Sequence, residues 1–399
     1  MKISLIDLTR QHNEISEDIN KAVSNIFQKS SFIMGENVKN FEQEFSSYLG
    51  IKHSISVGNG TDALVIALKA LNIGPGDEVI TTPFTFFATA ESIARVGAIP
   101  VFVDVELTSY NIDPNKIEEK ITEKTKAILP VHIFGNPCDM VKINNIAKKY
   151  NLFVIEDACQ AVGSKIGDKM IGTLSDIACF SFFPTKNLGC AGDGGMIVTD
   201  DDNLATICRA YRVHGSGVDG NRAYNLLNDV NEEIVIQDNS NNTIYNPMKY
   251  YNYLIGFNSR LDEIQAAILR LKLKKLNSYN EDRVKLAMKY NQELKGTKLI
   301  LPSSKNDYHH VYHLYILNSD KRADIINFLK EKGIATGIYY QIPLHLQKAF
   351  EYLNYKKGDF PNCEYLSDRT FAIPLYYGMT EEEQKYIIDT ILEWSKNNE

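Results

Sequence analysis

The sequence predicts an α/β protein: a large domain with a mostly parallel sheet flanked by helices, followed by a smaller C-terminal α+β domain. Short apolar runs alternate with segments of helical periodicity as far as residue 158, which is typical of βαβ units. Those apolar runs are nearly continuous, as expected for strands that are covered on both faces. A long helical pattern over 260–294 then leads into a segment of different rhythm.

The elements are expected in the following order. The chain up to about Leu49 is polar and helical, and Gly50 is a typical helix C-cap. Strands are then predicted at 54–57, 78–82, 99–105, 127–134 and 152–158, with helices at 61–73, 85–97, 114–122 and 140–151. Two further strands, at 177–183 and 194–200, are separated only by a loop, which predicts a hairpin-type insertion in the sheet.

The expected domain limits follow from this pattern. We expect a large domain over 1–250, a bridging helix over 251–276 and a small domain over 277–399. Residues 218–247 are rich in Asn and Asp and lack clear periodicity, so we expect an exposed excursion there.

Composition excludes several classes of partner. The 399 residues are 44% hydrophobic and 23% charged, with a formal net charge of −7 and no long run of one sign, so neither nucleic acid nor an anionic membrane surface is an expected partner. No apolar run approaches the length of a membrane span, and the apolar stretch at the start is too short for a signal peptide. The six cysteines form no C-x-x-C pair and have no His cluster at zinc spacing. We therefore expect reduced thiols, a cytoplasmic protein and no bound metal.

Three segments at the carboxyl ends of predicted strands could form one site, since ligands of open α/β sheets gather there. In "VGNGTDAL", residues 58–61 join a strand to a helix and could cradle a phosphate at the helix N-terminus. The same letters match a dinucleotide fingerprint, but the next strand ends in threonines rather than in the carboxylate that would hold a ribose. A tight turn with no ligand is the other interpretation.

The second segment, "VIEDACQA", places Asp157 at the end of a buried strand. A carboxylate there requires a positive partner, such as a cationic ring nitrogen, although Asp157 could also simply cap a neighbouring helix.

The third segment, "FFPTKNLGCAGDGG", places Lys186 directly after a buried strand. Lys186 is a candidate nucleophile there, and Ser181, five residues earlier, could bind a phosphate oxygen. Alternatively, the lysine only extends its ammonium out of the loop into solvent.

Together the three segments indicate one chemistry. Pyridoxal phosphate requires a lysine for its Schiff base, an acid that keeps the pyridine nitrogen protonated, and a cradle for its phosphate. Phe86 follows the strand at 78–82 and could cover one face of the cofactor ring.

These segments, together with "GDEVITTPFTFFATAESI", "VHIFGNPCDM", "GFNSRLDEIQAAIL", "HVYHLYIL" and "FAIPLYYGMT", resemble the DegT/StrS family of nucleotide-sugar aminotransferases almost from end to end. The resemblance implies the type I pyridoxal-phosphate transferase fold of aspartate aminotransferase. It also implies a homodimer with shared active sites.

The resemblance assigns a role to each candidate residue. Lys186 would form the Schiff base and Asp157 would pair with the pyridinium nitrogen. The other cofactor contacts would be Gln160 near the ring hydroxyl, Phe86 on the ring, Gly60, Thr61 and Ser181 on the phosphate, and Asn258 on the phosphate of the neighbouring subunit's cofactor. Four residues would contact the sugar or its nucleotide, or act as structural contacts: Arg260, His313, Tyr339 and His345.

The activity implied is transfer of an amino group, from an amino acid such as L-glutamate, to a keto group of a TDP- or UDP-linked hexose, with the 3-keto position favoured over the 4-keto position. Five positions depart from the family pattern. Cys159, Phe183 and Asp193 are compatible with the cofactor site, whereas Tyr339 replaces His and Gln341 replaces Pro near the expected sugar pocket.

Three other functions compete with this interpretation. Sugar dehydratases of the same family carry histidine in place of the Schiff-base lysine, whereas Lys186 is present here. A non-catalytic regulator would have to use the fold to sense a ligand, although the sequence has no helix-turn-helix pattern or basic patch. A nicotinamide oxidoreductase is suggested by "GNGTDA" alone.

Overall fold

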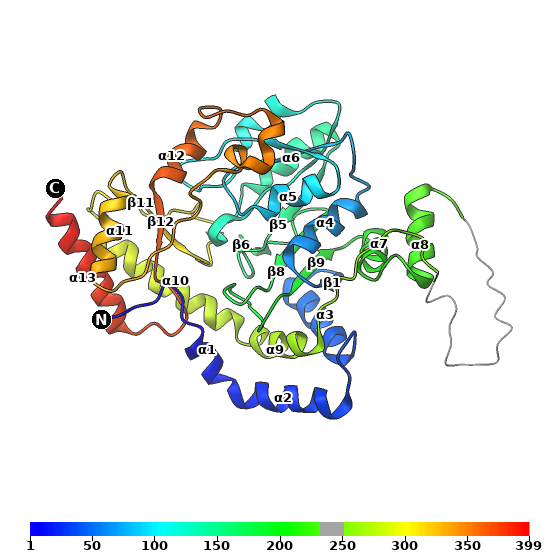
Figure 1. The fold of residues 1–399 in the computed structure, drawn as a ribbon, viewed down its shortest axis with the longest axis horizontal. Helices are drawn as coiled ribbons and strands as arrows, with labels where there is room; N and C mark the ends of the chain where they lie inside the picture. The colour runs from blue at the N-terminus through cyan, green and yellow to red at the C-terminus, as the bar shows by residue number, and fades with distance from the viewer. Residues whose placement is uncertain (232–250, 399) are drawn as a thin grey trace.

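The computed structural model describes residues 1–231 and 251–398 and is built around a seven-stranded sheet (Figure 1). The strand order is β1-β9-β8-β5-β4-β2-β3. All neighbouring pairs from β8 to β3 are parallel, whereas β9 runs antiparallel to both β8 and β1. The strands are β1 (His53–Val57), β2 (Glu78–Thr81), β3 (Ile99–Phe102), β4 (Thr125–Ile128), β5 (Phe153–Asp157), β8 (Ile177–Ser181) and β9 (Gly195–Thr199).

Both faces of this sheet are buried, which explains the unbroken apolar runs. In β8, Ile177 and Cys179 belong to the core under α4 (Gly60–Ala70) and α7 (Asp202–Arg212), whereas Ala178 and Phe180 belong to the core under α3 (Glu36–Leu49) and α9 (Glu263–Leu273). The remaining helices of this part are α1 (Thr9–Glu14), α2 (Ser16–Lys29), α5 (Ala88–Arg95), α6 (Met140–Tyr150) and α8 (Gly217–Asn228).

The C-terminal part has its own core. It contains α10 (Leu276–Glu293), α11 (Arg322–Glu331), α12 (Pro361–Arg369), α13 (Glu381–Lys396) and an antiparallel pair of strands, β11 (Tyr315–Asn318) and β12 (Thr370–Ile373). In Figure 1, α11 and α13 lie at the opposite end of the molecule from α7 and α8. Ile3 near the N-terminus packs in this C-terminal core. The domain limits that we expect from the sequence remain a proposal.

The small strands complete the description. β6 (Lys165–Ile166) pairs with β7 (Lys169–Met170) on one side and with β10 (Tyr308–His309) on the other. None of the helices within 1–231 and 251–398 combines the length and apolarity that a membrane crossing requires.

Four predicted elements differ in the structure. The strand expected over 127–134 is β4, which ends at Ile128, and the 3-10 turn η3 (Ile133–Gly135) follows it. The helix expected over 114–122 is instead two 3-10 turns, η1 (Pro114–Lys116) and η2 (Glu118–Lys120). The helix expected over 260–294 is two helices, α9 and α10, which separate at Lys274 and Lys275. The excursion expected over 218–247 begins as helix α8, and its residues 232–247 lie outside the described part.

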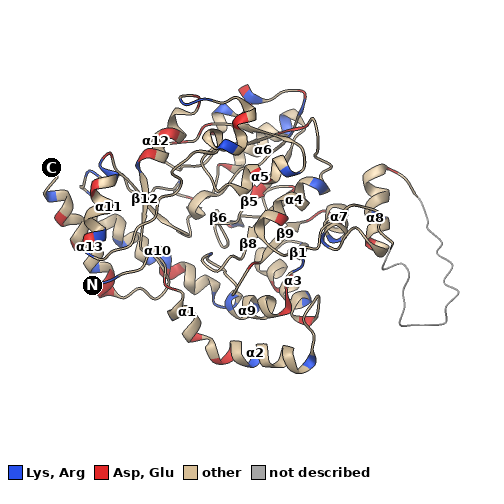
Figure 2. Ribbon diagram, viewed as in Figure 1, with Lys and Arg blue, Asp and Glu red and all other residues tan. Residues whose placement is uncertain are grey.

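Charges of both signs are interspersed along the described elements (Figure 2). One partly exposed pair joins the two ends of the chain: the guanidinium of Arg10 in α1 donates to both carboxylate oxygens of Glu383 in α13, at 2.6 and 2.7 Å. The Arg10 side chain, with the capping contact from Thr380, lowers the pKa of Glu383 to about 2.

We expect Arg10→Met to lower the free energy of unfolding at pH 7 by about 1 kcal/mol, because the pair is bidentate but still partly exposed. A carboxyl whose pKa is depressed by folding adds stability above its unfolded pKa and loses that stability as the pH falls. The difference between variant and wild type should therefore be full at pH 7 and shrink below about pH 4.5, towards pH 2. Urea unfolding at several pH values measures it. Lys385→Met, which removes an exposed pair with Asp389 in the same helix, is the control and should change little at any pH.

Candidate active site

The carboxyl ends of β1, β8 and β5 meet at one edge of the sheet. Gly195 at the start of β9 pairs with Val57 of β1 on one side and with Ser181 of β8 on the other. Asp157 at the end of β5 pairs with Cys179 of β8. The structure thereby brings the three segments singled out in the sequence into one place.

The first turn of α4 lies against Ser181. A Cβ on Gly60 would be 2.8 Å from the Ser181 Cβ and 3.1 Å from the Cys159 Sγ, so only glycine fits there. Asn59 caps the helix by accepting from the Asp62 N–H at 2.8 Å. The N–H groups of the first turn, including that of Thr61, lack acceptors within the helix and form an anion-binding end next to the Ser181 hydroxyl.

Asp157 is almost fully buried and is held by two donors. Its Oδ2 accepts from the Thr89 hydroxyl at 2.8 Å, and its Oδ1 accepts from the Cys159 N–H at 3.2 Å. Both donors are neutral, and Asp157 forms no ion pair within the described part of the chain, which is costly for a buried charge. The position therefore suits a cationic ligand.

Lys186 lies within electrostatic range of this carboxylate. It follows a tight turn in which its N–H donates to the Phe183 carbonyl at 2.8 Å. Burial lowers the pKa of Lys186, while the nearby Cys159 thiol and Asp157 carboxylate oppose that shift. A lysine in such surroundings has a larger neutral, nucleophilic fraction than one on the surface.

Gln160 is fixed at both ends of its amide. Its Oε1 accepts from the Phe134 N–H at 2.8 Å, and its Nε2 donates to the Tyr340 hydroxyl at 3.0 Å. The rings of Phe134 and Tyr340 stack with centroids 6.3 Å apart.

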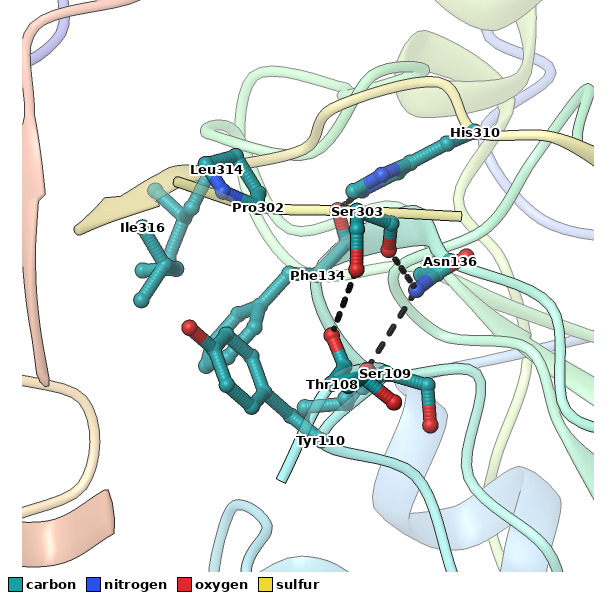
Figure 3. Close-up of a pocket in the computed structure, with 11 residues that line it drawn as sticks. Thr108, Ser109, Tyr110, Phe134, Asn136, Pro302, Ser303, His310, Leu314 and Ile316 are labelled. Carbon is teal, nitrogen blue, oxygen red and sulfur yellow. Dashed lines mark hydrogen bonds between the residues drawn. The ribbon is translucent and has the colours of Figure 1, made fainter. Parts of the chain in front are cut away.

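Phe134 also lines a small pocket, which Figure 3 shows with His310 and Asn136 among its other lining residues. Its volume of about 10 Å³ matches a single water molecule, so it cannot hold a nucleotide sugar. His310 Nε2 lies 3.1 Å from the Phe134 carbonyl. His310 therefore contacts the residue whose N–H donates to Gln160.

Phe86 and Asn258 are exposed side chains. Phe86 is 59% exposed, so its ring is free to cover a ligand. Next to Asn258, the Ser259 hydroxyl accepts from the Gly58 N–H at 3.0 Å and donates to Asp62 at 2.7 Å. The "GFNSRLD" segment therefore lies on the first turn of α4, with Arg260 half-buried beside it.

The three other residues expected near the sugar lie in different surroundings. His313 is buried, with Nδ1 3.3 Å from Oδ1 of Asn187, the neighbour of Lys186. His345 is buried with its Nε2 3.1 Å from Glu364, and Tyr339 is half-buried with its ring close to Gly337. Among the described residues, no hydrogen bond joins His345 or Tyr339 to Lys186.

A family model described as the DegT/DnrJ/EryC1/StrS aminotransferase family matches residues 13–392. The chain belongs to this family. A "pleiotropic regulatory protein" of Geobacillus stearothermophilus is 44% identical over 400 residues, covering all of both chains. The UDP-N-acetyl-3-dehydro-alpha-D-glucosamine 3-aminotransferase of Acidithiobacillus ferrooxidans is 40% identical over 381 residues, covering 96% of this chain and 95% of the relative.

Two solved structures share the whole fold. The DesV protein of S. venezuelae, solved with a ketimine intermediate, has a TM-score of 0.90 at 33% identity and covers 99% of both chains. The NtdA protein of Bacillus subtilis, solved with bound PMP, has a TM-score of 0.84 at 34% identity and covers 99% of this chain and 85% of its own. These structures confirm the predicted fold class.

Several residues that shape this aminotransferase-family site were not identified from the sequence. Thr89 orients Asp157, Tyr340 binds Gln160, and Asn187 binds His313. The sequence could have indicated Tyr340, because it adjoins Tyr339 in a segment that resembles the family pattern. No sequence pattern indicates Thr89 or Asn187, because their hydrogen-bond partners lie far away in the sequence.

The loop that carries Lys186 is held from α9. Lys272 is buried, and its Nζ donates to the Gly189 carbonyl at 2.8 Å and lies 3.1 Å from the His12 Nε2. Gln265 accepts from the Ala191 N–H at 2.8 Å. Burial lowers the pKa of Lys272 to about 8.

Proposed function

We propose that this chain is a pyridoxal-phosphate-dependent aminotransferase that acts on nucleotide-linked keto sugars. The observation that carries the proposal is the meeting of Lys186, Asp157, Ser181 and Gly60 at the carboxyl ends of β1, β8 and β5. Membership of an aminotransferase family supports the reaction class. The relative named as a UDP-sugar 3-aminotransferase supports the class of acceptor.

The side chains fit the cofactor in charge and shape. Asp157 is a buried carboxylate that forms no ion pair with any described residue, as the protonated ring nitrogen requires. Gly60 leaves a space beside Ser181 that a Cβ would fill, and with Thr61 it offers backbone N–H groups to the phosphate. Gln160 would hold the ring hydroxyl, Phe86 would cover the ring, and Lys186 would hold the cofactor covalently.

When bound, pyridoxal phosphate stabilises negative charge on the carbon next to the amine. The residues of the chain would hold and move the protons. Asp157 would keep the ring nitrogen protonated. Burial lowers the pKa of Lys186, so its Nζ has a larger neutral fraction than a surface lysine and would take a proton from the donor's α-carbon and return it at the cofactor's carbon.

The proposal also specifies the amino donor and the keto acceptor. We propose L-glutamate as the donor and the 3-keto group of a UDP- or TDP-linked hexose as the acceptor. Incubating the purified protein with pyridoxal phosphate, glutamate and a panel of 3-keto and 4-keto nucleotide sugars, with mass spectrometry of the products, tests both. An amino sugar formed from a 3-keto substrate supports the proposal, whereas product from 4-keto sugars alone would contradict the position.

A regulator without catalysis is the second candidate, favoured by the name of the Geobacillus relative. The same incubation distinguishes the two functions, since a regulator would release no 2-oxoglutarate from glutamate.

All six cysteines are free thiols, which supports the proposal of a reducing, cytoplasmic location.

We further propose a homodimer in which Asn258 reaches the phosphate of the partner's cofactor. Three large apolar side chains support this by their exposure: Ile255 is 92% exposed, Phe86 59% and Phe183 49%. Large apolar side chains left exposed in one subunit can be covered in an interface.

Ile255→Glu should convert much of the dimer to monomer and lower activity along with it, because each site would lose the partner's Asn258. Light scattering and the amino-transfer assay measure the two effects. Val141 is 63% exposed on α6, and Val141→Glu is the matched control that should leave both unchanged. A wild-type monomer with full activity would contradict the shared site.

A further inference from the structure

The residue after the candidate Schiff-base lysine is buried in a polar cluster that the proposed mechanism does not use. This cluster consists of Asn187, Asn280 and His313. Asn280 lies on α10, and His313 lies just before β11, so both belong to the C-terminal part of the chain. Asn187 therefore links the Lys186 loop directly to that part.

Backbone carbonyls fix the orientation of both amides, because a carbonyl can only accept. Asn280 Nδ2 donates to the Val162 carbonyl at 3.0 Å, so its Oδ1 faces Asn187. Asn187 Nδ2 donates to that Oδ1 at 2.7 Å and to the Val311 carbonyl at 3.2 Å. The Oδ1 of Asn187 is left to face His313.

The orientation of Asn187 in turn fixes the tautomer of His313. Its Nδ1 lies 3.3 Å from the Asn187 Oδ1, an acceptor, so Nδ1 must carry the proton. Burial, together with the charges of Lys186 and Arg283, holds the pKa of His313 well below its usual range. The imidazole is therefore neutral, and its Nε2 is an unprotonated acceptor.

Arg283 reinforces this arrangement from the other side. Its buried guanidinium donates to the carbonyls of Tyr312, His313 and Leu375, at 3.2, 3.4 and 3.1 Å. The His313 N–H also donates to the Phe134 carbonyl at 2.8 Å, so the backbone of this residue is fixed on both sides. The ring cannot turn to exchange its two nitrogens without breaking the contact with Asn187.

We propose that Asn187 is a positioning residue that fixes His313 as the Nδ1–H tautomer and so presents its Nε2 as a hydrogen-bond acceptor for the Lys186 amine. An N–H of Lys186 donated to Nε2 would orient the lysine lone pair during proton transfer. The catalytic part of this inference rests on the proposed aminotransferase function, whereas the tautomer does not.

The test begins with the cofactor-free wild-type protein labelled with ¹⁵N-histidine, in which His313→Gln identifies the signal of His313. The expected spectrum at pH 7 shows a protonated Nδ1 and an unprotonated Nε2. A protonated Nε2, in the other neutral tautomer or in the cation, would overturn the proposal. This result does not depend on folding of an Asn187 variant or on detection of any enzymatic activity.

Two variants then test the role in the loaded enzyme. Asn187→Asp keeps an acceptor for Nδ1–H but adds a negative charge, so it should raise the His313 pKa. In the pH–rate profile of amino transfer, the acidic limb should then shift to higher pH by about one unit or more. Asn187→Ala should lower the rate about tenfold without that displacement. An unchanged acidic limb in Asn187→Asp, with the wild-type tautomer as expected, would show that Asn187 only fills the structure and would overturn the positioning role.

Discussion

Lys186→Ala should abolish steady-state amino transfer, with a loss of about 10³-fold or more, because the nucleophile and the proton carrier are the same side chain. Its Nζ is the amine at the strand ends that lies close to the Asp157 carboxylate, and burial favours its neutral form. Substitution by alanine leaves the phosphate cradle of Gly60 and Ser181 intact. The variant should therefore still bind pyridoxal phosphate, but without a covalent bond.

Two controls accompany this variant. Lys186→Arg keeps the positive charge but not the nucleophile and should be as inactive as the alanine variant. Lys149→Ala removes an exposed lysine of α6 and should leave the rate unchanged. Substantial turnover by Lys186→Ala would refute the assignment of this residue.

Asp157→Asn should lower the rate by roughly 10²–10³-fold, which corresponds to about 3–4 kcal/mol, because the substitution breaks one side of a buried charge pair. Asparagine has the same shape, and its amide oxygen can still accept from Thr89 or from the Cys159 N–H. The cofactor should therefore remain bound through Lys186 and the phosphate cradle. Rate measurements, with cofactor content determined on the same sample, separate these two effects.

Thr89→Val is the matched comparison for Asp157→Asn. It removes one donor to the carboxylate and keeps the charge, so the rate should fall much less than in Asp157→Asn. If Asp157→Asn kept the wild-type rate, the carboxylate would not be the partner of the ring nitrogen.

Local sequence patterns predicted the strands of the sheet and singled out the three segments that the structure brings together, because each signal lay within one short segment. The end of a buried strand followed by Asp157, and the loop that carries Lys186, could be read without knowledge of the partner strands. Conversely, the helix expected over 114–122 formed only two 3-10 turns, η1 and η2. Its pattern could not specify the tertiary contacts that decide between a continuous helix and short turns.

The residues that orient the site could not be predicted for a different reason. Thr89 and Asp157 are 68 positions apart, and Gln160 and Tyr340 are 180 apart. Hydrogen bonds over such separations depend on how the elements pack, which neither periodicity nor local propensity specifies. The Asn187 cluster joins residues 93 and 126 positions apart and was missed for the same reason.

The most direct test of the proposed function is the visible absorption of the purified protein loaded with pyridoxal phosphate. The cofactor's band should appear on loading, fade when L-glutamate is added, and return when a 3-keto nucleotide sugar follows. If glutamate bleaches the band and no sugar restores it, amino transfer from glutamate is supported and the proposed acceptor is wrong. If no band forms, or if glutamate leaves it unchanged, the assignment of Lys186 and Asp157 to amino transfer is contradicted.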